Sequence, residues 1–148
     1  MDSLQPYLVF LIPIAVGIIT QIIKFVLYTI KHGFNIEYAF THGHMPSAHT
    51  SLVISLLVTM AYYEGVQSAA FALSAVLAFI VIDDAARIRM YLGDQGRYLN
   101  MLIDQLKGEI DERKFPHLKE RIGHHVSEVV GGALVGFFLT LLFISLFA

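Results

Sequence analysis

The chain has 148 residues, of which 56% are hydrophobic and only 15% charged, and its mean hydropathy is +0.65. Soluble domains carry about 25% charged residues, so this composition excludes an ordinary soluble fold and predicts one membrane-embedded domain over residues 1–148. The net charge is −2 without a basic run, and cysteine is absent. Nothing therefore favours nucleic acid binding, disulfides or thiol chemistry.

Four apolar segments follow one another, over about residues 7–30, 47–63, 67–82 and 126–148. Each is close to the roughly 20 residues that a spanning helix needs, although the second and third are short. Glu64-Gly65-Val66 predicts a tight hairpin between those two. The first residues lack the basic region and cleavage site of a signal peptide, so we expect the first segment to stay in the membrane. The prediction is an all-α integral membrane protein, a helical bundle of about four transmembrane helices.

One polar region, about residues 83–125, separates the third and fourth apolar segments. It contains apolar residues at helical spacing with charges on the opposite face: Leu99, Leu102, Ile103, Leu106 and Ile110. This pattern predicts an amphipathic helix, on the membrane surface or against the bundle, between spans three and four.

The basic residues predict the orientation of the bundle. All ten lysines and arginines are Lys24, Lys31 or lie between Arg87 and Arg121. With four spans they fall on one side, which the positive-inside rule makes cytoplasmic, with both termini outside. We expect a multi-pass protein of the plasma (inner) membrane whose polar residues gather at the cytoplasmic face.

The stretch of residues 41–51 contains three histidines and a proline at the mouth of the second apolar segment. Pro46 suits the first position of a helix, and the unpaired N–H groups of a helix start form an anion site. Ser47 and Thr50 add hydroxyl donors, and His49 titrates near neutral pH. The stretch predicts a bound phosphate; the alternative is an ordinary polar helix start at a membrane surface.

The four-span topology brings four helix ends together at this face. Lys24 lies within apolar sequence, where an ionisable side chain is costly unless it is paired or hydrated. His124 and Glu128 stand four residues apart, on one face of a helix. A carboxylate there can hold one imidazole N–H and raise the basicity of the other nitrogen. Such a histidine suits attack on phosphorus, and His49 could protonate the leaving group.

Three segments together resemble the divergent branch of the phosphatidic acid phosphatase type 2 superfamily, which is related to acid phosphatases and vanadium haloperoxidases. The segments are His44-Met45-Pro46-Ser47-Ala48-His49-Thr50, Asp84-Ala85-Ala86-Arg87-Ile88-Arg89 with Gly93 and Gln95, and Gly123-His124-His125-Val126-Ser127-Glu128-Val129. The resemblance covers nearly the whole chain, from Lys24 to Gly136. Pro-Ser-Ala-His alone is a weak signal, but the three segments in this order are fairly specific.

The resemblance implies a metal-independent phosphatase that acts through a phosphohistidine and needs no cofactor. His124 matches the nucleophile, Glu128 its orienting acid and His49 the general acid. The implied phosphate binders are Lys24, Ser47, Ala48 with the adjacent backbone N–H groups, and Arg89. Further residues could support phosphate binding: Lys31, His44, Thr50, Asp84, Arg87 and Arg121.

The chain departs from the wider superfamily at three positions. Lys31-His32 stands where that superfamily has Arg-Pro, Leu118 replaces an arginine six residues before the nucleophile, and Ala48 replaces a glycine. The resemblance implies Arg89 as the source of that charge, since Arg89 matches the divergent branch, with Arg87 or Arg121 as alternatives.

The predicted function is a phosphatase of membrane lipid phosphates. Phosphatidylglycerol phosphate or phosphatidate is favoured as substrate, and undecaprenyl diphosphate is a further candidate. One alternative is a metal-dependent lipid enzyme or transporter; another is an inactive relative that binds phospholipid or is structural. The metal alternative would use Asp83, Asp84, His42, His44 and His49, or His124 and His125. The pair Gly132/Gly136 is typical of close helix packing and offers a contact face for a homodimer.

Overall fold

The computed structural model describes residues 5–34, 45–106, 115–120 and 126–147, and in these ranges it contains helices and no strand. The helices are α1 (Gln5–His32), α2 (Ala48–Tyr63), α3 (Ala69–Asp83), the π-helix η2 (Asp84–Ile88), α4 (Arg89–Gln105) and α5 (Val126–Phe147). The predicted all-helical architecture is therefore confirmed for the described part of the chain.

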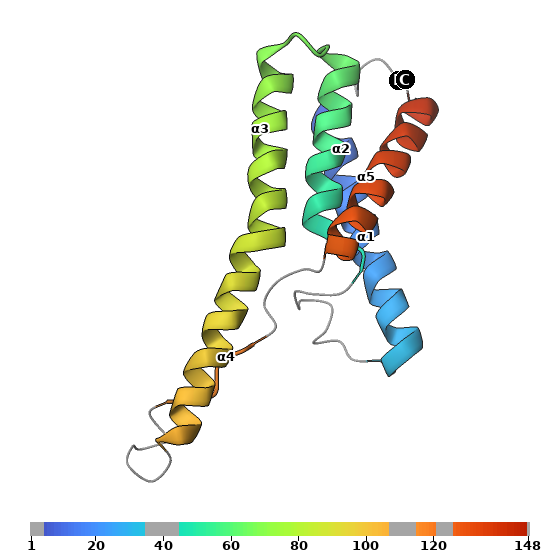
Figure 1. Ribbon diagram of the computed structural model, residues 1–148. Helices are drawn as coiled ribbons and strands as arrows, with labels where there is room; N and C mark the ends of the chain where they lie inside the picture. Colours follow the sequence, from blue (N-terminus) through green and yellow to red (C-terminus); the bar gives the residue numbers. More distant parts are fainter. Residues whose placement is uncertain (1–4, 35–44, 107–114, 121–125, 148) are drawn as a thin grey trace.

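Helix α2 lies at the centre of the bundle, where it contacts α1, α3 and α5. The chain alternates in direction: the start of α1, the α2–α3 hairpin and the end of α5 lie at one end of the bundle (Figure 1). The end of α1 and the starts of α2 and α5 lie at the opposite end. The predicted meeting of these helix ends at one face is observed.

The predicted hairpin between the second and third apolar segments is also observed. Gly65 has a φ of +84°, a conformation that glycine adopts without steric cost. Ser68 then caps α3, because its hydroxyl accepts a hydrogen bond from the Phe71 N–H at 3.1 Å. The turn therefore reverses the chain within a few residues.

Three described helical stretches are long and apolar enough to cross a membrane, residues 7–32, 69–105 and 126–147. Helix α2 has 16 residues and rises about 24 Å, less than the roughly 30 Å of a bilayer core. By length and composition the described residues thus support three spans and one short apolar helix, so the predicted count of four spans is not confirmed. The short helix is surrounded on three sides by its longer neighbours.

The charged stretch that follows the third apolar segment continues the helix. Helix α3 passes through η2 directly into α4, as one helical run from Ala69 to Gln105. No proline or glycine interrupts residues 83–89, and two ion pairs, Asp83–Arg87 and Asp84–Arg89, offset the charges there. The predicted separate amphipathic helix is therefore an extension of the third helix.

The leucine face of this extension is not its buried face. Leu99 and Leu102 are exposed, whereas Gly96 and Asn100 are buried against residues 118–120. The Asn100 side chain is 2% exposed; its Nδ2 donates to the Leu118 carbonyl at 2.9 Å, and its Oδ1 accepts from the Leu118 N–H at 2.9 Å. Leu99 and Leu102 therefore do not pack against the bundle, one of the two placements that we predicted, and the other, on the membrane surface, stays a prediction.

We expect Asn100→Ala to release the segment of residues 115–120 from α4. The variant loses both bonds to Leu118 and a third bond, from Nδ2 to the Glu120 carboxylate at 2.9 Å. Unpaired buried backbone groups cost about 1–3 kcal/mol, so the Leu118 amide should exchange with deuterium at least about tenfold faster. The matched control is Gln95→Ala, at an exposed position of the same helix. Unchanged exchange at Leu118 in Asn100→Ala would refute this role.

The interfaces of α1, α2 and α5 share a four-residue spacing. The buried positions are Ile12, Val16, Thr20 and Lys24 on α1, Ser47, Ser51, Ser55 and Thr59 at and along α2, and Glu128, Gly132, Gly136, Thr140 and Ile144 on α5. Small residues at this spacing let helix backbones approach closely in a membrane. A Cβ atom on Gly136 would lie 2.5 Å from the Ser51 carbonyl oxygen, and one on Gly132 would overlap that of Ser47.

The two glycines therefore serve close helix packing, as predicted, but the packing is within the chain. Because α2 covers Gly132 and Gly136, they do not provide the face that we expected between two copies. A homodimer remains a prediction that would need another surface.

Candidate functional site

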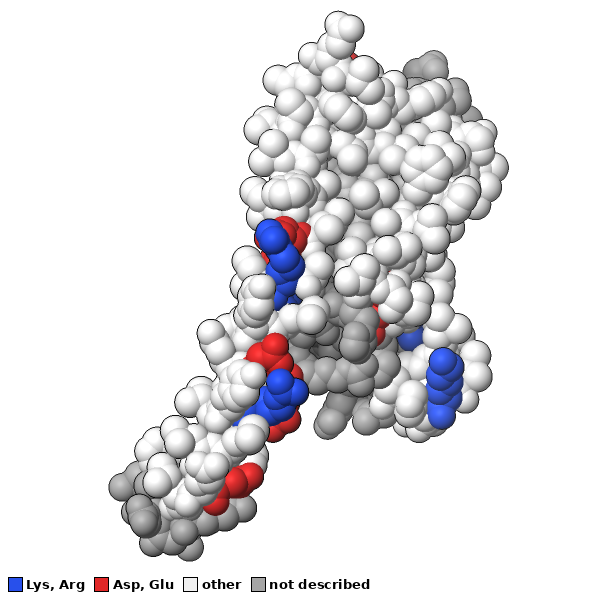
Figure 2. All heavy atoms as spheres, viewed as in Figure 1, with Lys and Arg blue, Asp and Glu red and all other residues white. Residues whose placement is uncertain are grey.

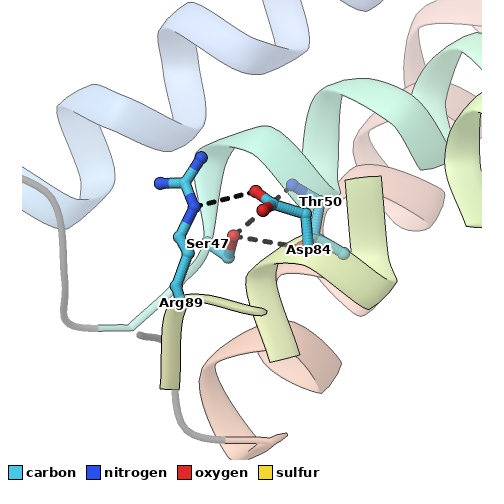
Figure 3. A network of polar contacts seen from close by, with 4 residues as sticks. All are labelled: Ser47, Thr50, Asp84 and Arg89. Atoms are coloured by element: carbon cyan, nitrogen blue, oxygen red, sulfur yellow. Dashed lines mark hydrogen bonds and ion pairs between the residues drawn. The ribbon is translucent and has the colours of Figure 1, made fainter. Parts of the chain in front are cut away.

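Ser47 caps the start of α2 and is fully buried. Its hydroxyl oxygen accepts hydrogen bonds from the Thr50 hydroxyl at 3.0 Å and from the Thr50 N–H at 3.4 Å (Figure 3). Helix α2 begins at Ala48, so Pro46 precedes the cap instead of taking the first helical position as predicted. A serine that can satisfy the helix N–H groups explains the shift, because the cap position favours such a side chain.

Three predicted site residues converge here from three helices. The Ser47 N–H donates to the Glu128 carbonyl oxygen at 3.1 Å, which joins the start of α2 to the first turn of α5. Lys24 of α1 interacts electrostatically with Glu128. The exposed fractions are 4% for Lys24, 0% for Ser47 and 6% for Glu128. A buried cation, a buried carboxylate and a helix N-terminus thus meet at one end of the bundle.

Lys24 and Lys31 lie in different surroundings, although both belong to α1. Lys24 is buried, whereas Lys31 is exposed in the last turn of α1. A buried lysine is costly unless a negative charge compensates it, and Glu128 provides one. Lys24 is therefore the lysine whose charge is held inside the bundle.

The predicted phosphate-binding arginine, Arg89, is already ion-paired. Its Nε donates to the Asp84 carboxylate at 2.8 Å, and its terminal nitrogens point away from that carboxylate (Figure 3). Arg87 pairs with Asp83 one helical turn away. Both aspartates are thus partners of arginines, a role that competes with the predicted metal-site alternative. The helix η2, which carries Asp84, contacts α5.

The remaining site residues divide into described and undescribed ones. His49 is exposed in the first turn of α2, next to the half-buried Ala48. Four predicted residues fall outside the described residues, so their positions stay predictions: His44, Arg121, His124 and His125. His42, which the metal alternative invoked, also falls outside them.

Charged residues gather toward the end of the bundle that carries the site. In the face shown in Figure 2, Lys, Arg, Asp and Glu lie over the lower half of the view and along α4, while the upper half is almost uncharged. This distribution follows the sequence, in which every lysine and arginine belongs to one side of the predicted topology.

A pocket of about 380 Å³ adjoins the site between α1 and α5. Its walls are mostly apolar, and Lys24 is part of them. The lining residues are Ile23, Lys24, Leu27, Tyr28, Lys31, His32, Met45, Pro46, Gly131 and Val135. A molecule that carries a phosphate could therefore reach Lys24 through this apolar pocket.

Sequence reasoning missed the buried hydroxyl groups behind the site. The Thr20 and Ser51 hydroxyls lie 2.6 Å apart, and the Thr140 hydroxyl donates to the Ser55 hydroxyl at 2.6 Å. Apolar periodicity does not reveal these residues, since they are polar and face inward. The signal that could have found them is the spacing of Ser47, Ser51, Ser55 and Thr59, one small hydroxyl residue every fourth position.

Comparison with known proteins agrees with the resemblance noted in the sequence. A family model described as "Divergent PAP2 family" matches residues 7–139. The chain is also 37% identical over 109 residues to a Bacillus subtilis (strain 168) protein named "Uncharacterized membrane protein YuiD", a match that covers 67% of this chain and 69% of that protein. No solved structure matches the chain significantly. The chain is a membrane protein that belongs to the Divergent PAP2 family.

Proposed function

We propose that this protein is a metal-independent phosphatase of membrane lipid phosphates that acts through a phosphohistidine. The observation that carries the proposal is the convergence of Lys24, Ser47 and Glu128 at the start of α2. The cation and the helix N-terminus suit the negative charge of a phosphoryl group. The family of the chain supports the same reaction class.

In the proposed first step, a ring nitrogen of His124 attacks phosphorus and the bond to the leaving oxygen breaks. His49 donates a proton to that oxygen, so the alcohol departs neutral. Water, deprotonated by His49, then attacks phosphorus and breaks the P–N bond. Inorganic phosphate leaves and His124 is restored. Glu128 stabilises the charge that develops on the imidazole, and Lys24 with Arg89 balances that of the phosphoryl oxygens.

The lipid substrate class follows from the position of the site. The site lies at one end of a bundle whose other end and flanks are apolar, so the tail of a lipid can stay in the bilayer while its phosphate reaches Lys24. By the positive-inside rule we expect this end to face the cytoplasm, and we propose the plasma membrane as the location of the protein. Phosphatidylglycerol phosphate or phosphatidate, made on that leaflet, is favoured over undecaprenyl diphosphate.

The test of this function is phosphate release from a panel of lipid phosphates by the purified protein in EDTA. We expect release that vanadate inhibits and that falls at least about 1,000-fold in His124→Ala, because the variant lacks the nucleophile. The control is His117→Ala, since His117 is exposed and belongs to the segment held by α4 rather than to the start of α5.

Two outcomes would contradict the proposal. Release that requires an added divalent metal would favour a metal-dependent enzyme. Binding of lipid phosphates by the folded protein without release of phosphate would favour an inactive relative.

A further inference from the structure

The pocket between α1 and α5 adjoins the proposed phosphate site through Lys24, and two further lining residues lie close in sequence to Ser47 and Glu128. Lys24 forms part of its wall, Pro46 directly precedes Ser47, and Gly131 follows Glu128 by less than one helical turn. The remaining lining includes the aliphatic side chains of Ile23, Leu27 and Val135. An apolar pocket with one buried cation at its wall fits an amphiphile that carries an anion at the end of a chain.

We propose that this pocket holds an acyl chain of the substrate, so that the lipid reaches the site sideways, between α1 and α5. This inference rests on the proposed phosphatase function for the identity of the anion, but the chain-binding site can be tested without turnover. It assigns Leu27 and Val135 to substrate binding, a role that the sequence motifs do not give them.

Both helices that form the pocket are long and apolar enough to span a bilayer, so its aliphatic wall is expected to lie against lipid. A soluble phosphate would gain nothing from these walls, whereas an acyl chain exchanges one apolar surrounding for another and can follow its headgroup to Lys24. The exposed Lys31 and His32 line the outer part, at the end of α1. Cations at that level attract anionic headgroups from the membrane surface.

The absence of tryptophan from the chain allows a direct test. We would introduce Leu27→Trp as the only tryptophan, in His124→Ala protein so that no substrate is consumed, and reconstitute it in phosphatidylcholine vesicles. Phosphatidate with brominated chains, which quench tryptophan on contact, is then added at low mole fraction. We expect quenching at least about threefold stronger than for brominated phosphatidylcholine at the same fraction, because the site concentrates the anionic lipid.

The matched control is Val130→Trp in the same background. Val130 is exposed on α5 next to Gly131, but it does not line the pocket. The preference for phosphatidate should be confined to Leu27→Trp and should fall when Lys24→Gln is added. Equal quenching by the two lipids at Leu27→Trp, or equal preference at both positions, would overturn the inference even if hydrolysis in EDTA is observed.

A kinetic experiment with the active protein tests the same inference. Val135→Phe narrows the pocket, so the KM for a long-chain lipid phosphate should rise at least about fivefold relative to that for a short-chain phosphate ester. Val130→Phe, outside the pocket, should leave the ratio of the two KM values as in the parent. The same ratio in Val135→Phe and in the parent would also overturn the inference. Hydrolysis of no phosphate ester by the parent would instead refute the phosphatase function and leave the quenching result to decide the chain-binding site.

Discussion

Glu128→Gln is expected to lower kcat/KM for lipid phosphate hydrolysis about 100-fold, because a neutral amide cannot stabilise the charged imidazole proposed at His124. The substitution also removes the negative charge that interacts with the buried Lys24. The measurement is steady-state hydrolysis in EDTA, with folding checked by thermal unfolding in detergent. Glu64→Gln is the control, since this carboxylate is exposed at the far hairpin.

A double-mutant cycle separates the two roles of Glu128. If Lys24 and Glu128 stabilise each other, Lys24→Gln with Glu128→Gln should cost less unfolding free energy than the two single changes together. The loss of hydrolysis, in contrast, should persist in the double variant. A Glu128→Gln protein with parental kcat/KM would exclude the carboxylate from the mechanism.

Gly132→Ala is expected to destabilise the bundle by about 3 kcal/mol, near the upper end of the usual cost of overpacking. The added Cβ would overlap the Ser47 carbonyl oxygen, a backbone atom that cannot move without shifting the start of α2. Because this shift would also separate Ser47 from Glu128, hydrolysis should fall with stability. The measurement is reversible unfolding in mixed detergent micelles.

Gly131→Ala is the matched control for Gly132→Ala. Its added Cβ would lie 2.7 Å from the Met45 Cε, the flexible end of a side chain that can rotate away. The expected cost is below about 1 kcal/mol. Equal stability of the two variants would show that α2 and α5 do not pack as closely as the structure indicates.

The sequence was sufficient to predict the order and direction of the helices at the site end. Long apolar runs, the Glu64-Gly65 turn and the one-sided placement of lysine and arginine are strong signals, since each reflects the cost of burying polar groups in a bilayer. Lys24 was separable from Lys31 by its apolar neighbours alone. These features depend on local amino-acid composition, which can be read from a single sequence.

What the sequence could not predict depends on which face of a helix is covered. The leucines of α4 have ideal amphipathic spacing, yet Gly96 and Asn100 form its buried face, because the backbone of residues 118–120 packs there. Nor did the charges of residues 83–89 end α3, since each aspartate pairs with an arginine further along the chain. Apolar periodicity did not reveal the face of α4 that packs against residues 118–120, because that contact is tertiary.

The most direct test of the central claim is to trap the phosphoryl group on the protein. The parent protein is incubated briefly in EDTA with a lipid phosphate labelled on phosphorus, quenched in alkali, digested and mapped. The account predicts an alkali-stable, acid-labile label on the peptide that contains His124, absent from His124→Ala. Hydrolysis by the parent protein with no label on any histidine, or with a label on another residue, would contradict it.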